Sequence, residues 1–354
     1  MSTVRRTLGR LAVPLVALAT ALAIGAVLML ARGANPVKAY AALFNGAFGD
    51  LDSVLTTIER ATPLVLTGLA VCLGYRGGVF NIGAEGQLVL GGMAATAVGL
   101  RWAGLPPVVH AGLALAAGAL AGALWSLLPG LLRARRGVNE VITTLMLNTV
   151  AVQLLAWAVR VDVGAGGALG WLGLKDPTQP FPRSASIAAG ARLPELLSEY
   201  PVSVAAVVAL GATLIVWFVL ARTTFGFALV VVGANPHAAR VAGIPVERTL
   251  LGTMLASGAL AGLAGALEIT GSQHRIIDDF LSGGGYDGIA VALVGLLHPV
   301  GVVAAALFFG GLRAGANTMQ IATGVPVSLV AMLKCLAIVA LLSARVIQDR
   351  RRDA

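Results

Sequence analysis

The stretch that decides the fold is TLLGTMLASGALAGLAGALEIT, residues 249–270, in which Glu268 is the single charged residue. An apolar run of about 20 residues is long enough to cross the hydrocarbon core of a bilayer as a helix. The many glycines and alanines of this run allow neighbouring helices to approach closely. The stretch therefore predicts a transmembrane helix packed inside a bundle.

Similar runs recur along the whole chain. Of its 354 residues, 58% are hydrophobic and only 12% are charged, whereas soluble domains carry about 25% charged residues. We therefore predict an all-α polytopic membrane protein, a single transmembrane domain over residues 1–354 with about ten transmembrane helices. The candidate spans lie near residues 11–30, 61–75, 79–100, 106–129, 138–160, 201–221, 249–270, 284–297, 299–317 and 325–344.

The positions of Lys and Arg predict the orientation, because short cytoplasmic loops carry an excess of both. With ten spans and a cytoplasmic N-terminus, the densest basic clusters fall on one side, which predicts that both termini lie in the cytoplasm. The net charge of +9 reflects these flanking clusters and gives no basic face for nucleic acid. The clusters are Arg5/Arg6/Arg10, Arg133/Arg135/Arg136, Arg222/Arg240/Arg248 and Arg345/Arg350/Arg351/Arg352.

Three connecting segments are long enough to have structure of their own. Residues 39–60 predict an amphipathic periplasmic surface helix, and residues 161–200, rich in Gly, Pro and Trp, predict an ordered periplasmic loop. Residues 222–248 form a long cytoplasmic segment. Glycine, aromatic and Asn/Asp residues occur in similar order at 78–83 and 285–289, which is consistent with two inverted halves.

The first candidate for chemistry is the glycine-rich run at residues 77–87. Asn81 and Glu85 are four residues apart, so we predict that they share one helix face, and Gln87 follows them in the same run. A carboxylate at membrane depth is costly and faces the bundle interior or a partner. Two interpretations remain: these side chains line a substrate pathway, or Glu85 is a structural carboxylate bonded to a neighbouring helix.

Two further groups of polar residues lie in predicted spans. Glu140, Thr144 and Asn148 recur every four residues and predict one polar stripe, which either lines the pathway or joins helices. Asp287 follows three glycines and falls in the first turn of the eighth predicted span, where it either contacts substrate or balances the helix dipole. The predicted pathway residues are Asn81, Glu85, Gln87, Asn148 and Asp287.

Several kinds of site are excluded by pattern. The four histidines are scattered, and Cys72 and Cys335 lie in apolar runs, so neither a metal site nor a disulfide framework is predicted. The chain has no Walker A sequence, HExxH or GxSxG. We therefore expect no cofactor and no catalytic activity, and we expect that the chain cannot hydrolyse ATP by itself in the usual P-loop way.

Long motifs resemble one known family, in the same order along the chain. They are VFNIGAEGQLVLGGMAA (79–95), VNEVITTLMLN (138–148), GANPHAARVAGIPVER (233–248) and GGGYDGIAVALVGLLHPVGVVAAALFFGGLRAG (283–315). The chain is similar in these motifs to permease subunits of nucleoside importers, within the simple-sugar and branched-chain-amino-acid class of ATP-binding-cassette permeases. The resemblance covers roughly residues 60–345 and implies import of nucleosides or related small polar solutes.

The resemblance also implies partners and a coupling site. Such a permease pairs with a second homologous permease in the lipid membrane, with cytoplasmic ATP-binding subunits and with an extracytoplasmic substrate-binding lipoprotein. Its cytoplasmic docking pattern corresponds here to Gly233, Asn235, Ala238, Ala239, Gly243 and Ile244. The alternative function is a self-contained ion-coupled transporter or channel, in which Glu85 and Asp287 would exchange protons or bind sodium.

Overall fold

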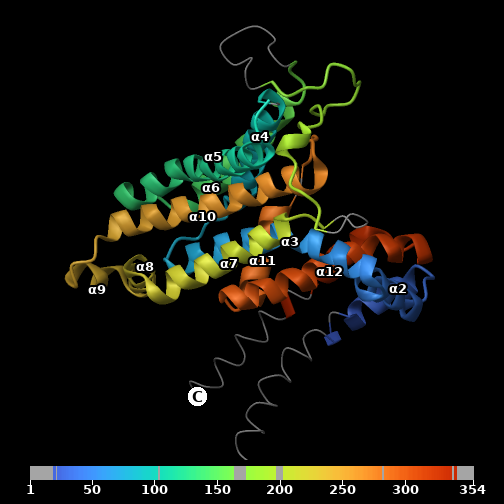
Figure 1. Ribbon diagram of the computed structural model, residues 1–354. Helices are drawn as coiled ribbons and strands as arrows, with labels where there is room; N and C mark the ends of the chain where they lie inside the picture. The colour runs from blue at the N-terminus through green and yellow to red at the C-terminus, as the bar shows by residue number, and fades with distance from the viewer. Residues whose placement is uncertain are drawn as a thin grey trace, which may run out of the picture. The chain divides into compact units, whose positions relative to one another are not determined.

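The computed structural model describes residues 19–20, 22–102, 104–162, 173–196, 202–280, 283–336 and 339–340 of the chain. In these residues the regular structure is helical, with isolated β-bridges but no named strand (Figure 1). This confirms the predicted all-α class. The labelled helices are α2 (Pro36–Phe48), α3 (Leu51–Arg76), α4 (Ala84–Arg101), α5 (Pro107–Arg136), α6 (Glu140–Ala158), α7 (Ala205–Arg222), α8 (Thr224–Ala234), α9 (Pro236–Val241), α10 (Val246–Glu268), α11 (Gly284–Val294) and α12 (Pro299–Thr323).

Six helical stretches among the described residues are long and apolar enough to cross a membrane. They are Leu51–Arg76, Pro107–Arg136, Glu140–Ala158, Ala205–Arg222, Val246–Gln273 and Pro299–Thr323. Shorter apolar helices include Leu22–Ala31, α8, α11 and Val327–Leu336. The predicted multi-pass character is thus confirmed, while the count of ten stays a prediction. Most of the first predicted span, 11–30, lies outside the described residues.

Some predicted boundaries were wrong because glycine and polar residues interrupt the apolar runs. The predicted span 79–100 begins as a helix only at Ala84. The predicted span 284–297 yields α11, whose 11 residues extend about 16 Å, roughly half of a bilayer core. The predicted surface helix over 39–60 divides at Gly49-Asp50 into α2 and the start of α3.

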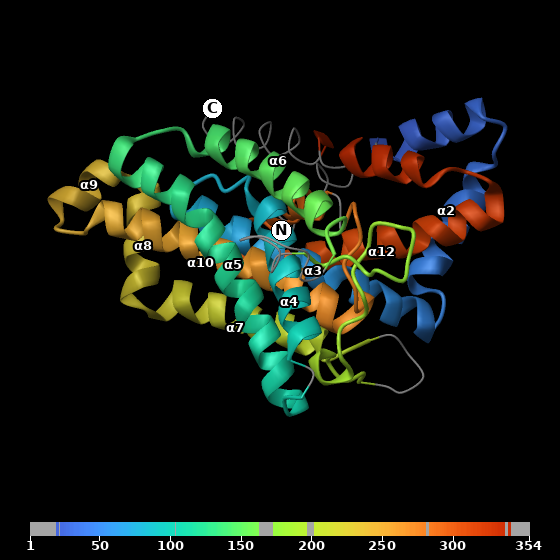
Figure 2. The same cartoon turned by 90° about the horizontal axis from the view of Figure 1, so that it is seen from above.

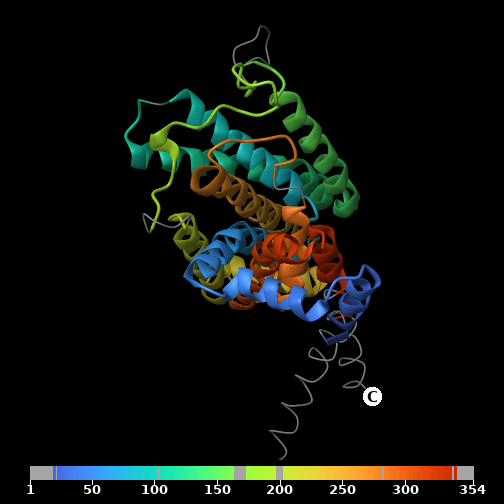
Figure 3. The same cartoon turned by 90° about the vertical axis from the view of Figure 1, so that its right-hand side faces the viewer.

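The chain forms two compact units, residues 1–61 with 307–354 and residues 62–306. In the first unit, α2 lies beside the C-terminal part of α12, and Figure 3 shows these blue and red helices packed together. Their contact is close, since a Cβ on Gly315 would lie 2.1 Å from the Leu43 carbonyl oxygen. Met29, Met319 and Leu333 belong to the core of this unit.

The second unit is built around α10, which packs against both α4 and α5 (Figure 2). Glycines allow this approach: a Cβ on Gly91 would lie 2.1 Å from the Gly262 carbonyl oxygen, and one on Gly122 would lie 2.2 Å from that of Gly258. Such backbone-to-backbone packing is the usual means by which transmembrane helices associate. It fixes the three helices that surround the candidate site.

Two glycines of α5 give a matched test of this packing. Gly122→Ala is expected to destabilise the protein by about 1–3 kcal/mol or more, because the added methyl group overlaps the α10 backbone. Gly112→Ala is the control, since a Cβ there meets nothing within 4 Å and alanine favours the helix by about 0.5–1 kcal/mol. Thermal unfolding in detergent measures both, and equal midpoints for the two variants would contradict the close α5–α10 contact.

Candidate functional site

The candidate site is centred on an unwound segment, residues 77–83, between α3 and α4. Gly78 has φ +72° there, a left-handed conformation that glycine adopts without a steric penalty. In a membrane, backbone that leaves the helix is tolerated only where protein or a cavity satisfies its polar groups. The side chains around this segment supply those partners.

Asn81 and Gln87 form a reciprocal amide pair inside the protein. Asn81 Nδ2 donates to Gln87 Oε1 at 2.8 Å, and Gln87 Nε2 donates back to Asn81 Oδ1 at 3.1 Å. Asn81 also accepts from the Gly83 amide at 3.0 Å and donates to Ser257 Oγ of α10 at 2.8 Å. Asn81 precedes α4, so the prediction that it shares a helix face with Glu85 was wrong.

The predicted polar stripe of α6 lies along the unwound segment. Glu140, Thr144 and Asn148 are all buried on one face of the helix, as their spacing predicted. Asn148 Oδ1 accepts from the Gly86 amide at 3.0 Å, and its Nδ2 donates to the Ile82 carbonyl at 2.9 Å. Asn148 therefore satisfies backbone groups on both sides of the point where α4 begins.

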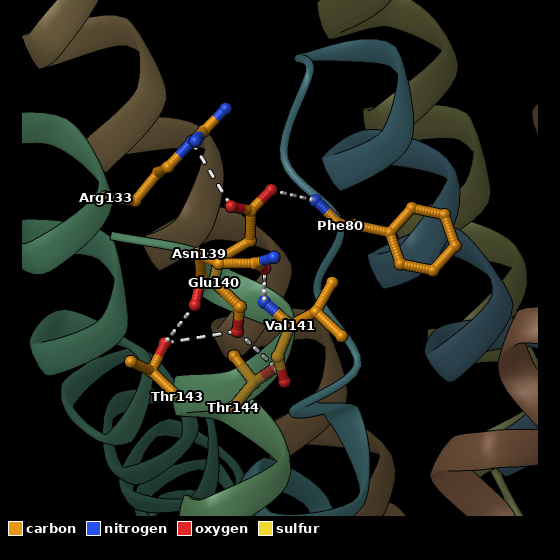
Figure 4. Close-up of polar contacts among 7 residues, drawn as sticks. All are labelled: Phe80, Arg133, Asn139, Glu140, Val141, Thr143 and Thr144. Carbon is orange, nitrogen blue, oxygen red and sulfur yellow. Dashed lines mark hydrogen bonds and ion pairs between the residues drawn. The ribbon is translucent and has the colours of Figure 1, made fainter. Parts of the chain in front are cut away.

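Glu140 holds the beginning of the same segment (Figure 4). Its Oε1 accepts from the Phe80 amide at 3.1 Å, and its Oε2 lies 3.2 Å from Arg133 Nε at the end of α5. The cap of α6 is Asn139, whose side chain accepts from the Val141 amide at 2.9 Å. Glu140 thus joins α5, α6 and the unwound segment.

Replacing Glu140 separates its two roles. Glu140→Gln keeps an acceptor for Phe80 and loses only the ion pair, which should cost at most about 1 kcal/mol because the Arg133 side chain is 36% exposed. Glu140→Leu also leaves the Phe80 amide without its acceptor and should cost about 1–3 kcal/mol more. Arg133→Gln is the control for the ion pair. If thermal unfolding showed the same loss of stability for Glu140→Gln and Glu140→Leu, the hydrogen bond to the Phe80 amide would not contribute to stability.

Glu85 connects the start of α4 to the start of α11. Its Oε1 accepts from the Gly283 amide at 2.7 Å and its Oε2 from the Gly285 amide at 2.6 Å. The close approach of α11 to α4 requires glycine at position 285, because a Cβ there would lie 2.2 Å from the Glu85 amide nitrogen. The carboxylate therefore balances the positive end of a second helix while remaining 4% exposed.

Asp287 lies in the first turn of α11, as predicted, and is 8% exposed. The structure thus brings Asn81, Glu85, Gln87 and Asn148 together around residues 77–86, with Asp287 on the helix that Glu85 holds. Ser257 was not predicted to contribute, and Arg133 was predicted only as part of a flanking basic cluster. Tyr286 was also missed, although it stands in the glycine-rich motif beside Asp287.

The predicted docking residues lie in and around α9. Asn235 caps this helix, accepting from the amides of His237 and Ala238 at 3.0 Å each. Ala239 is fully buried in a cluster with Val232 and Val246, and the half-buried Ile244 packs against that cluster. Gly243 ends the helix with φ +79°. The exposed residues of this segment include three of the predicted set, Asn235, Ala238 and Gly243, and also His237, Arg240 and Val241.

Gly233 faces the interior of the second unit. A Cβ there would lie 2.0 Å from the Arg76 carbonyl oxygen and 2.9 Å from the Gly78 amide nitrogen. The segment that carries α9 therefore rests directly on the end of α3 and the start of the unwound segment. Arg76 Nε also donates to the Leu297 carbonyl after α11, at 2.7 Å.

A separate cleft of about 640 Å³ opens where α5 begins. Apolar side chains such as Val108 and Leu115 line it together with Arg192, Glu195 and His274. Burial lowers the pKa of His274 below its ordinary value, which favours the neutral imidazole at pH 7.

Two backbone hydrogen bonds hold the segment 173–196 against the chain that follows α10. The Leu193 amide donates to the Thr270 carbonyl, and the Ile187 amide donates to the His274 carbonyl, each at 2.8 Å. Among the described residues no group of three or more His, Cys, Asp or Glu is placed to hold a metal ion.

Comparison with known proteins gives consistent matches along nearly the whole chain. Residues 53–342 match the family described as branched-chain amino acid transport system / permease component. A guanosine ABC transporter permease protein of Bacillus subtilis is 42% identical over 91% of this chain and 90% of its own length. No solved structure shows a significant match.

Two further relatives differ in their named solutes. A glucose ABC transporter permease protein of Haloferax volcanii is 37% identical over 94% of this chain and 87% of its own length. A nucleoside ABC transporter permease protein of Lactococcus lactis is 33% identical over 87% of this chain and 84% of its own length. The resemblance predicted from the sequence motifs is confirmed by these matches.

Proposed function

Because the chain belongs to the family of branched-chain amino acid transport system permease components, we propose that it is the permease subunit of an ATP-driven nucleoside importer. The observation that carries the substrate class is the 42% identity to a guanosine permease over 91% of the chain. A permease moves its solute without making or breaking bonds. ATP hydrolysis belongs to a separate subunit.

The importer has three kinds of partner in this proposal. Cytoplasmic ATP-binding subunits dock on the exposed face of α9, and an extracytoplasmic lipoprotein delivers the solute. A second, homologous permease completes the pathway. The exposed Ala238 and Val241 support docking at α9, because apolar side chains left exposed on a short helix favour a partner surface.

The proposed location is the bacterial inner membrane, with both termini in the cytoplasm. The basic clusters at the ends of apolar runs support this orientation. It places α9 on the cytoplasmic side, as an ATP-driven partner requires. The segment 39–60 and the loop 161–200 then lie on the periplasmic side.

The proposed pathway residues are Asn81, Glu85, Gln87, Asn148 and Asp287. All five are buried within the chain, and hydrogen bonds join the first four to neighbouring protein groups. We propose that they form the wall behind the pathway and fix its shape. Unwound backbone flanked by helix starts is a common way for transporters to build a site at mid-membrane depth.

Two other functions have specific support. A related glucose permease is 37% identical, which favours a sugar as the alternative solute. An ion-coupled transporter would need intramembrane acids that exchange ions. Glu85 is instead engaged by two backbone amides, and the family match also favours the importer.

Co-purification tests the assembly. A tagged chain, expressed in its own organism and isolated in mild detergent, is expected to bring an ATP-binding subunit and a second permease with it. A stable, transport-active chain that purifies without any ATP-binding protein would contradict the proposal and favour the ion-coupled alternative.

A further inference from the structure

Tyr286 occupies an unusual position in the second unit. It lies in the first turn of α11, and 42% of its surface is exposed. Its hydroxyl oxygen accepts from Asn148 Nδ2 at 3.1 Å, and Asn148 itself is buried. The tyrosine is therefore fixed at its polar end by α6 while its ring reaches the surface of the chain.

The contact with Asn148 gives the depth of the tyrosine hydroxyl. Asn148 lies about 12 Å from the start of α6 at Glu140 and about 15 Å from its end at Ala158. Because α6 is a candidate membrane span, this midpoint corresponds to the centre of the bilayer. Tyrosine exposed to lipid is found mainly at the two membrane interfaces. An exposed tyrosine at mid-depth therefore argues against lipid on this face.

Neighbouring residues of α6 support the same conclusion. Thr149 and Gln153 are both exposed and, four residues apart, lie on one face of the helix. α6 also exposes Leu145, Met146 and Val152, so its outer face is mixed, whereas the exposed residues along the middle of α7 include Leu210, Leu214 and Phe218, which suit lipid. Polar side chains within membrane spans normally face a partner or a water-filled space. These three exposed polar residues, Tyr286, Thr149 and Gln153, are together named the mid-depth polar face.

We propose that Tyr286 is a substrate-contacting residue of the permease, whose ring stacks on the flat base of a nucleoside as it passes the mid-depth polar face. The inference rests on the proposed function and assigns a residue to it. Aromatic rings bind bases of different kinds through their π-faces. A hydroxyl that accepts from Asn148 still has its hydrogen to donate, and no described residue accepts it, so it can bond an acceptor of the solute.

Two buried residues, Glu85 and Asn148, hold Tyr286 in its position. Glu85 fixes the amides of Gly283 and Gly285, which flank the start of α11, and Asn148 fixes the ring by its hydroxyl. Both are therefore positioning residues for Tyr286. The rival occupant of the mid-depth polar face is the second permease, packed against the ring without any space for solute.

Thiol labelling distinguishes water, lipid and protein at this position. In the complete importer, with Cys72 and Cys335 replaced by alanine, Tyr286→Cys is expected to react with a membrane-impermeant methanethiosulfonate, and guanosine should slow the reaction. Leu214→Cys is the control, because Leu214 lies midway along α7 and is 67% exposed. It should not react. Absence of reaction at 286, or a reaction that no nucleoside slows, would overturn the proposal.

Uptake of radiolabelled guanosine gives the second readout. Tyr286→Leu should weaken apparent affinity by about 5- to 100-fold, the range expected for loss of base stacking, and Tyr286→Phe by roughly 2- to 10-fold, the range for one hydrogen bond. Phe218→Leu, on α7, should transport normally. Normal affinity in Tyr286→Leu would contradict the inference alone, whereas a wild-type complex that moves no nucleoside would contradict the proposed function. If the Tyr286→Leu variant purified without the second permease, the mid-depth polar face would be a packing surface between the two permeases.

Discussion

Glu85→Gln is expected to reduce sharply the amount of folded protein and to lower its unfolding temperature. Both carboxylate oxygens accept a backbone hydrogen bond, from Gly283 and Gly285. An amide has one acceptor oxygen, so its NH₂ group would face a backbone donor in a buried place. Losing a bond to a charged acceptor and leaving a buried donor unpaired together cost about 3 kcal/mol.

The effect of Glu85→Gln is compared with that of a matched substitution at an exposed carboxylate, and transport is measured as well. Asp52→Asn is the control for loss of charge, because Asp52 is exposed in the first turn of α3. Abundance after purification, the unfolding midpoint and uptake per assembled complex are measured together. Wild-type abundance and stability with altered solute selectivity would show that Glu85 acts on the solute directly and does not mainly position α11.

An added negative charge should have different effects at two nearby residues of the cytoplasmic segment 222–248, disrupting folding at one and docking at the other. Ala239→Asp is expected to abolish folding of this segment, since Ala239 is fully buried between Val232 and Val246 and an unpaired buried charge costs several kcal/mol. Val241→Asp should leave the protein folded, because Val241 is 79% exposed. It should instead weaken binding of the ATP-binding subunit and uncouple transport.

The measurement is protein abundance together with ATPase activity stimulated by solute in the assembled complex. We expect low abundance for Ala239→Asp, and normal abundance with lost stimulation for Val241→Asp. Full stimulation in Val241→Asp would show that the ATP-binding subunit does not dock on this face of α9. The distinction comes from burial, which the docking pattern in the sequence does not reveal.

Periodicity predicted those parts of the site that lie on regular helices. The four-residue spacing of Glu140, Thr144 and Asn148 correctly placed them on one buried face of α6, and Asp287 lies in the first turn of its helix as expected. The same reasoning failed for Asn81, because the helix begins only at Ala84. Spacing assigns a face only where the helix is continuous.

Contacts between distant segments could not be predicted from the spacing of residues. Glu85 bonds to amides about 200 positions away, and the significance of Gly285 depends on that approach. Likewise Gly233, predicted as a docking residue, packs against the backbone of Arg76 and Gly78. Glycine in a motif marks close packing, but the sequence does not say whether the neighbour belongs to the same chain or to a partner.

The most direct test of the central claim is guanosine uptake into proteoliposomes that hold the complete complex with its substrate-binding protein. We predict uptake that requires ATP on the side of α9, persists when ionophores dissipate ion gradients, and is not displaced by excess glucose. Uptake driven by an ion gradient without ATP would contradict the assignment as an importer permease, and glucose uptake in place of guanosine would contradict the nucleoside assignment.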